Sequence, residues 1–594
     1  MISRRAVLAG GVAAGVTATY AATPRAAAAA PEPGPGSSAS AAPSGGAGPS
    51  ILPIEPTDGI DRIIAKAARI VPRPAQVAWQ RKEVTAFTHF GMNTFTDREW
   101  GSGMEVETRF APTDVDVDQW MSAYRATGAK QAMLTAKHHD GFVLYPTRYS
   151  PHSVANSGWR HDLLGEYVTA ARAAGLRVGV YLSPADGAEL PHDWFANVYV
   201  PYIQAKPVSQ RSTNEVATLQ DLPGAPRGLG RYGSGSAVVP RTIPTLVDGD
   251  DRAGRVASGE LPTFHVEADD YNAYYLNQVY EIFTQYGPID EFWLDGANPW
   301  SGSGVTEDYD FTTWFQLIGA LSADTVTFAG PQGTRWVGNE GGSARTTEWS
   351  VVADTADPAT RHGEGILVGG AQASDLGSRY VLADPSVRFV QWFPAEADVS
   401  IRPGWFYHAS QSPKTPAQLV GIHHTSVGRN ALLLLNVPPA ANGRIADADV
   451  ASMTSFGTAV RETYATNLLA GNGHDPQDPD FRALTDGELT SSWSPHANGT
   501  AGTVTLELAE AVTFDQIRLG EDITHGQQVE QFVVDTWDGS AWQRAVRGTT
   551  IGYSRIVVLD SPVTTDRLRV QILDARSTPR LALVGAYRTV EPRT

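Results

Sequence analysis

Two acidic side chains in this 594-residue chain stand where paired carboxyl chemistry would need them. Asp295 closes the apolar run E-F-W-L-D-G, and Glu340 lies 45 residues later in the glycine-flanked run R-W-V-G-N-E-G-G. A charge at the end of a buried strand persists only where it is paired or used. A carboxylate on one side of a sugar and a protonated carboxyl on the other are what glycoside hydrolysis requires. The structural alternative is a salt bridge from Glu340 to Arg335 or Arg345.

Other polar residues also fall at the ends of predicted strands. The apolar runs predict strands over Val84–His89, Gln131–Ala136, Arg177–Leu182, Ile289–Leu294 and Thr325–Phe328. The polar residues at or just beyond these ends include His89, His138, His139, Tyr181 and Asp295. Parallel barrels build their active sites at the carboxyl ends of the strands, so we expect these residues to converge. Adjacent histidines on an extended backbone point to opposite sides, which disfavours a zinc or iron site at the H-H-D run.

Helical patterns separate these strands. Apolar spacing of three and four residues predicts helices from about Asp116 to Gly128, from Asp162 to Ala174, from Tyr271 to Tyr286 and from Phe311 to Leu321. Alternating strands and helices with short turns imply parallel strands joined by helical crossovers. The expected class is therefore α/β, with a (β/α)8-type, TIM-like barrel over 56–465. The stretch from Asp186 to His265 lacks clear periodicity, and it either shapes the site or elaborates the surface.

The side chains around the acids indicate what the site would bind. Apolar faces are offered by Trp100, Trp293 and Trp336, and directional hydrogen bonds by His89, Glu99, His138, His139 and Tyr181. A pocket with both kinds of surface suits a deoxy-sugar, whose methyl group needs an apolar wall and whose hydroxyls need polar partners.

From about Leu468 the pattern changes to short alternating strands. A hairpin turn is expected at Asp538-Gly539, and the whole of 466–594 is predicted to be an antiparallel β-sandwich. Its tryptophans, Trp493, Trp537 and Trp542, are either a sugar platform or packing residues.

The N-terminus has the composition of a targeting signal. Residues 1–30 combine the paired arginines of S-R-R-A-V-L with an Ala-rich apolar run, which predicts a cleaved twin-arginine export signal; an uncleaved membrane anchor is the alternative. Residues 31–55 are rich in Pro, Gly, Ala and Ser and are expected to form a linker. We therefore expect a secreted, extracytoplasmic protein with no membrane contact in its mature form.

Composition excludes several classes of protein. The chain has no cysteine, so disulfide scaffolds, thiolate metal sites and cysteine nucleophiles are ruled out. Its net charge is −18 with no Lys/Arg-rich run, which argues against nucleic acid as a partner. Oligomeric state is left open.

Seven runs together resemble a known family. They are T-H-F-G-M-N-T-F-T-D-R-E-W-G, A-K-H-H-D-G-F, V-Y-L-S-P-A-D, D-D-Y-N-A-Y-Y-L-N-Q-V-Y-E, Y-G-P-I-D-E-F-W-L-D-G-A, R-W-V-G-N-E-G-G-S-A-R-T-T-E-W-S and R-P-G-W-F-Y-H. In this order, from about Pro56 to Pro439, they resemble glycoside hydrolase family 29, the α-L-fucosidases, and most of all its α-1,3/1,4-specific subgroup, which acts on Lewis-type glycans.

The resemblance implies a retaining mechanism. Asp295 would form a covalent fucosyl-enzyme, and Glu340 would protonate the leaving oxygen and then activate water, with no metal or organic cofactor. The motif positions that bind fucose in the family are His89, Glu99, Trp100, His138, His139, Tyr181 and Trp293, and Trp336 is added as a wall. Two rivals stay open: a broad or α-1,2-acting fucosidase, and a non-catalytic glycan-binding protein on a barrel scaffold.

The C-terminal region has a resemblance of its own. The run L-T-D-G-E-L-T-S-S-W and the strand order resemble the discoidin, or coagulation-factor type C, fold. This resemblance leaves open a structural calcium ion near Asp486.

Overall fold

The computed structural model describes residues 48–593, except for 223, 233–235, 306, 476, 490 and 497–498. The predicted export signal, and the predicted linker as far as residue 47, lie outside the described residues. The end of the linker segment is part of the fold: β1 (Ile51–Pro53) pairs with β11 (Phe389–Trp392), which also pairs with β10 (Val351–Asp354).

The central sheet has eight parallel strands that follow one another around a ring. They are β2 (Val84–Thr88), β3 (Gln131–Lys137), β4 (Arg177–Leu182), β7 (Glu291–Trp293), β8 (Val326–Thr327), β9 (Arg335–Trp336), β12 (Ala395–Ser400) and β13 (Ala431–Asn436). The hydrogen-bonded order is β8-β7-β4-β3-β2-β13-β12-β9. A parallel bridge between Phe328 and Thr334 joins the two ends. This sheet is consistent with the predicted (β/α)8 barrel.

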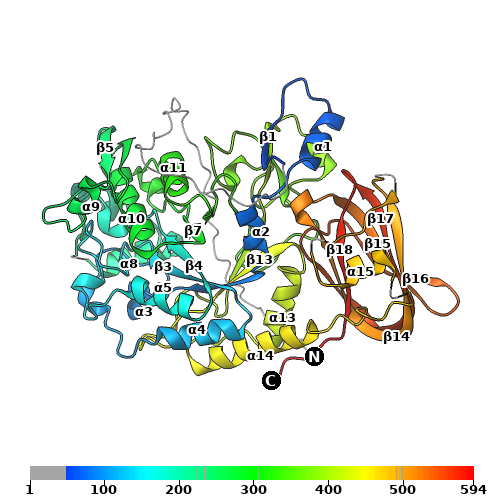
Figure 1. Ribbon diagram of the computed structural model, residues 1–594. Coiled ribbons are helices and arrows are strands. Elements are labelled where there is room, and N and C mark those ends of the chain that lie inside the picture. Colours follow the sequence, from blue (N-terminus) through cyan, green and yellow to red (C-terminus); the bar gives the residue numbers. More distant parts are fainter. Residues whose placement is uncertain are drawn as a thin grey trace, which may run out of the picture.

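Helices pack around this sheet (Figure 1). They include α2 (Pro74–Gln80), α4 (Val117–Ala126), α5 (Leu163–Ala173), α10 (Asp270–Tyr286), α11 (Phe311–Leu321), α13 (Pro416–Thr425) and α14 (Asp447–Thr463). Four of them begin on an aspartate whose carboxylate accepts a backbone N–H of the first turn: Asp116, Asp162, Asp269 and Asp310. These caps satisfy donors that a helix start leaves free, which explains why the predicted helix boundaries were accurate to within a few residues.

The aperiodic stretch between β4 and α10 folds into short pieces. They are α6 (His192–Trp194), a π-helical turn (Phe195–Tyr199), α7 (Val200–Ala205), α8 (Thr213–Gln220) and α9 (Ala253–Ala257), with a hairpin of β5 (Val239–Ile243) and β6 (Phe264–Ala268). No piece is long enough to produce a clear period in the sequence. Within the described residues, no helix is long and apolar enough to cross a membrane.

The C-terminal strands form one five-stranded antiparallel sheet, in the order β16-β15-β17-β14-β18. Their bounds are β14 (Gly502–Glu521), β15 (Val529–Trp537), β16 (Trp542–Gly548), β17 (Arg555–Ala575) and β18 (Leu581–Tyr587). Short predicted strands are here fused into the long β14 and β17, and the hairpin at Asp538-Gly539 joins β15 to β16 as expected. Figure 1 shows the sheet beside the barrel, close to α13.

The C-terminal tryptophans differ in their surroundings. Trp493 is 6% exposed and belongs to the apolar core of this region, so it is a packing residue. Trp537 and Trp542 are half-buried, and the guanidinium group of Arg569 lies 4.4 Å from the ring centre of Trp542.

Asp486, where the resemblance leaves open a calcium ion, is already hydrogen-bonded. Both of its carboxylate oxygens accept hydrogen bonds, from the backbone N–H of Glu488 and from the hydroxyl of Ser491. In the described part of the chain, no group of three or more His, Asp or Glu side chains is arranged to hold a metal ion.

Candidate active site

Asp295 lies just beyond the carboxyl end of β7 and is held from several directions. Its Oδ2 accepts a hydrogen bond of 2.9 Å from the Tyr181 hydroxyl and lies 3.6 Å from Nε2 of His139. Its Oδ1 accepts the backbone N–H of Ala297 at 2.9 Å. The side chain is 28% exposed, so one carboxylate is fixed in direction while remaining open to a substrate. This is the geometry that a nucleophilic carboxylate needs.

Glu340 follows β9, on a turn that is exposed to solvent. Desolvation by the protein on its inner side nevertheless raises the pKa of its carboxyl group, and repulsion by Asp295 adds to this. Interaction with the Trp405 indole opposes the shift. The two acids thus act on each other electrostatically, and the surroundings of Glu340 shift its titration toward the protonated form.

The salt-bridge alternative for Glu340 is wrong. Arg335 and Arg345 both pair with the buried carboxylate of Glu348, the former through a short contact and the latter at 3.2 Å. Because the guanidinium groups of Arg335 and Arg345 both pair with Glu348, neither is the ion-pair partner of Glu340.

The three predicted histidines come together at the ends of β2 and β3. The rings of His138 and His139 lie with their centres 4.1 Å apart, and those of His89 and His138 lie 5.5 Å apart. The expectation that the adjacent pair points to opposite sides is wrong, because both residues follow the last residue of β3 and the backbone turns there.

His89 and His139 are buried, His138 is partly buried, and all three are uncharged near neutral pH. Desolvation lowers the pKa of each, for His89 to about 3. His89 Nδ1 lies 2.8 Å from the Asn436 amide oxygen, which can only accept, so the ring proton is assigned to Nδ1. The Asn436 amide nitrogen donates to Ser400 and to the Trp405 carbonyl, which supports this orientation. Nε2 of His89 is therefore left as a hydrogen-bond acceptor, a role that suits a sugar hydroxyl.

Glu99 and Trp100 belong to the segment that follows α3 (Met92–Thr96) and lie at the same end of the barrel as the three histidines. Glu99 accepts the backbone N–H of Trp405 at 2.8 Å and contacts His408 Nε2 at 2.6 Å. The Trp100 ring lies 4.1 Å from that of His139, centre to centre. Glu99 thus links the two motifs T-D-R-E-W-G and R-P-G-W-F-Y-H across the mouth of the barrel.

Trp293 and Trp336 are each fixed by a buried acid of β12. The Trp293 indole donates to Glu396 at 3.0 Å, and its ring stacks on Phe328 with 3.7 Å between ring centres. Trp293 is 8% exposed and so presents little of its face. The Trp336 indole donates to Asp398 Oδ1 at 2.8 Å, and this ring is only half-buried.

The sequence analysis missed three residues of the site, Trp405, His408 and Asp398. The first two stand in the quoted run R-P-G-W-F-Y-H, so their motif was visible although no role was assigned to them. Asp398 lies in the fully buried strand β12, whose run A-E-A-D-V-S places two acids in a barrel interior. Acids spaced by two residues in a short apolar strand are the signal that would have found it.

Asp398 is a third carboxyl group near the pair. Burial raises its pKa to about 8, with further repulsion from Glu340 and Asp295, whereas the hydrogen bond from Trp336 lowers it. The folded protein therefore holds a proton here at neutral pH, while the unfolded chain, with an ordinary pKa of 3.8, releases it. It follows that the free energy of unfolding falls as the pH rises from about 4 to about 8.

We expect Asp398→Asn to remove this dependence. Asparagine keeps an oxygen that accepts the Trp336 indole N–H but does not titrate. The stability of the variant relative to wild type should therefore increase with pH, by an amount on the order of 2–4 kcal/mol between about pH 4.5 and pH 7.5. Urea unfolding at both pH values measures this. Asp398→Ala, which also loses the acceptor, is the control, and a pH-independent difference for the asparagine variant would contradict the assignment.

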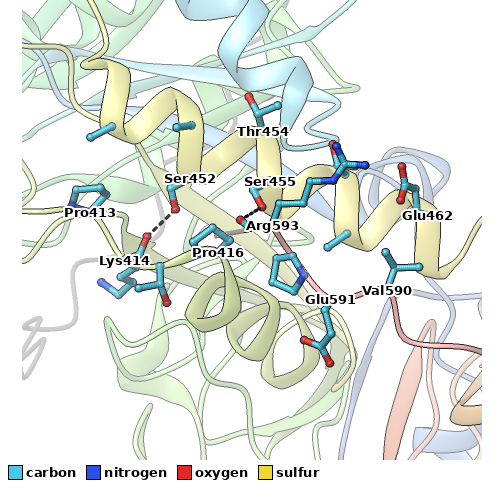
Figure 2. Close-up of a pocket in the computed structure, with 16 residues that line it drawn as sticks. Pro413, Lys414, Pro416, Ser452, Thr454, Ser455, Glu462, Val590, Glu591 and Arg593 are labelled. Atoms are coloured by element: carbon cyan, nitrogen blue, oxygen red, sulfur yellow. Dashed lines mark hydrogen bonds between the residues drawn. The ribbon is translucent and has the colours of Figure 1, made fainter.

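The surface also has a groove that lies apart from the predicted site residues. It has a volume of about 810 Å³ and lies between α14, the 413–416 segment and the C-terminal residues 590–593 (Figure 2). The Ser455 hydroxyl donates to the Arg593 carbonyl at 2.6 Å on its wall. None of the predicted site residues lines it.

Comparison with known proteins agrees with this geometry. The model of the family described as alpha-L-fucosidase matches residues 70–462. Alpha-L-fucosidase 1 of Arabidopsis thaliana is 32% identical over 544 residues, which cover 87% of this chain and 88% of that protein. The crystal structure of SpGH29 is 33% identical with a TM-score of 0.65, covering 88% of this chain and 98% of that one.

A further solved structure contains a sugar. The Ruminococcus gnavus GH29 fucosidase in complex with fucose is 25% identical, with a TM-score of 0.66, covering 88% of this chain and 95% of that one. The extent of these matches, together with the paired acids at the mouth of a parallel barrel, identifies the chain as a member of glycoside hydrolase family 29, the alpha-L-fucosidases.

Proposed function

We propose that the chain is a retaining exo-fucosidase that releases α-1,3- and α-1,4-linked L-fucose from Lewis-type glycans through a covalent fucosyl-enzyme. The observation that carries the mechanism is the pairing of an oriented carboxylate, Asp295, with a carboxyl of raised pKa, Glu340. The linkage preference rests on the likeness of the motifs to one subgroup of the family.

The two steps follow from these groups. Asp295 Oδ attacks the anomeric carbon as the glycosidic bond breaks, and Glu340 delivers its proton to the departing oxygen. Glu340, now a carboxylate, takes a proton from water, whose oxygen attacks the same carbon and releases Asp295. Both displacements invert the anomeric centre, so the product retains the configuration of the substrate.

The surrounding groups bind without changing charge. Neutral His89, His138 and His139 provide donors and acceptors of fixed direction because burial keeps them unprotonated. Trp336 is proposed to contact the apolar part of the sugar. The fucose held by the R. gnavus enzyme supports fucose as the ligand of this site.

We also propose that the C-terminal region is a discoidin-like sandwich and that the protein is exported. The register shifts of β14 against β17, between Glu507 and Val512 and between Phe514 and Gln516, support the former because such bulges bend long strands over a core. The paired arginines near the N-terminus support the latter.

A substrate panel tests the linkage preference. We expect strong fucose release from Lewis a and Lewis x trisaccharides, with little from 2′-fucosyllactose or an aryl fucoside. The reverse ranking would favour a broad or α-1,2-acting enzyme. Glycan binding without release from any of the substrates would favour a non-catalytic protein.

A further inference from the structure

The segment 337–350, which contains Glu340, lies between the barrel and the C-terminal sheet. Its first part is tied to β12: Val337 N–H donates to the Glu396 carbonyl at 2.9 Å, and Gly342 N–H donates to the Asp398 carbonyl at 3.0 Å. Glu340 therefore occupies a short turn between two anchored points. Its second part, 345–350, leads directly to contacts with the other domain.

Arg345 connects the two parts of this segment. Its guanidinium group donates to the carbonyl of Val337, three residues before Glu340, at 2.9 Å. The same group contacts the Glu348 carboxylate at 3.2 Å, and the Arg345 backbone N–H donates to that carboxylate at 3.0 Å. Glu348 also pairs with Arg335 of β9. Glu348, together with the Ala371 and Ala373 carbonyls that also accept from the Arg345 guanidinium group, thus helps to set where Arg345 holds the base of the Glu340 turn.

Residues of the C-terminal domain hold Glu348 by its backbone. The Thr550 hydroxyl accepts the Glu348 N–H at 3.2 Å, and the Gln527 amide nitrogen donates to the Glu348 carbonyl at 3.0 Å. Gln527 also accepts the Ser350 N–H at 2.7 Å. Glu348, Ser350, Gln527 and Thr550 are all at most 1% exposed.

Two further contacts join the C-terminal domain to the same segment. Arg555 donates to the Thr346 carbonyl at 2.7 Å, and the hydroxyls of Thr347 and Thr549 lie 2.8 Å apart. The buried contacts of this network, those of Glu348, Ser350, Gln527 and Thr550, favour one arrangement, since breaking them leaves desolvated groups without partners. The C-terminal domain therefore restricts the conformation of the 345–350 segment more than apolar packing alone would.

We propose that the C-terminal domain positions the general acid, with Thr550 and Gln527 acting through Glu348 and Arg345 as positioning residues for Glu340. The inference rests on the proposed role of Glu340. It gives the domain a part in the reaction that does not involve binding sugar. Misplacement of a proton donor by a fraction of an ångström weakens proton transfer to the leaving group while leaving the nucleophile, Asp295, in place.

The substitution Thr550→Val tests this in the full-length chain. Valine keeps the shape of threonine but cannot accept the Glu348 N–H. We expect kcat/KM for a Lewis trisaccharide, which has a poor leaving group, to fall about 3- to 10-fold. The value of kcat/KM for dinitrophenyl fucoside, an aryl fucoside that is expected to be a slow substrate but whose leaving group needs no proton, should change less than about 2-fold, since it reports the first step alone. Thr550→Ser, which restores the hydroxyl, should recover the loss.

Thr565→Val is the matched control. Thr565 is also a buried threonine of this domain, 3% exposed, and its hydroxyl accepts the backbone N–H groups of Trp537 and Arg567 and none of the 345–350 segment. The variant should have lower thermal stability and an unchanged ratio of the two kcat/KM values. Equal ratios for the Thr550 and Thr565 variants would overturn the inference.

Glu340→Gln separates this failure from a failure of the proposed function. If Glu340→Gln itself shows no preference for the good leaving group, the role of Glu340 is wrong. If it shows that preference and Thr550→Val does not, only the positioning role of the domain is wrong.

Discussion

Asp295→Gly is expected to lower fucose release on the order of ten-thousandfold, because no other group would be placed to bond to the anomeric carbon. Azide enters the space left by the side chain and attacks from the same face. We therefore expect partial recovery of turnover with added azide, and a β-fucosyl azide, of inverted configuration, as the product. Proton NMR of the product measures the configuration directly.

Asp290→Gly provides the matched control for this experiment. Asp290 precedes the opposite end of the same strand β7, its side chain is 26% exposed against 28% for Asp295, and it accepts the Val178 N–H at 3.0 Å. The control should lose stability and some activity but gain nothing from azide. Absence of recovery in Asp295→Gly would contradict the nucleophile assignment, since recovery depends on the vacated position.

The first five strands of the barrel were predictable because each is an apolar run that ends in a turn, and the first four are followed further along the chain by the amphipathic helices α4, α5, α10 and α11. The strand Arg177–Leu182 and the helix Phe311–Leu321 match their predicted bounds. The later strands were harder. β9 has only two residues, and β12 carries the buried acids Glu396 and Asp398, so neither has the composition of a barrel strand. Their place is determined by tertiary pairing, of β12 with β13 and of β9 with β12, and not by local preference.

The site was predictable where chemistry and strand ends coincide. His89, Tyr181 and Asp295 follow that rule, and the structure brings them together. The partners that hold them are spread over distant parts of the chain: Asn436, which orients His89, comes from the last strand of the barrel. Such contacts cannot be derived from spacing. The same is true of the link from the C-terminal domain to Glu348, which joins residues about 200 positions apart and has no pattern in the sequence.

Glu340→Gln is expected to lower kcat/KM for a Lewis trisaccharide about a thousandfold, while kcat/KM for dinitrophenyl fucoside, which reports the first step alone and not the water-activating step, falls no more than about tenfold. Glutamine matches the shape of glutamate but has no proton to give, so the loss depends on how much the leaving group needs one. The pKa of Glu340 is raised, and its protonated form is the active one in the first step. In wild type, activity should therefore fall as the pH rises through that pKa, and this alkaline limb should be absent in the variant.

Glu99→Gln is the control within the same site. Glu99 is held by Trp405 and His408 and is proposed to bind the sugar, so its loss should affect both substrates alike. Azide gives an independent check on Glu340→Ala, because it attacks the fucosyl-enzyme and should yield an α-fucosyl azide, the configuration opposite to that from Asp295→Gly. Equal losses on both substrates for Glu340→Gln, or a β-azide from Glu340→Ala, would assign the proton transfer to another residue and leave the raised pKa of Glu340 without a catalytic role.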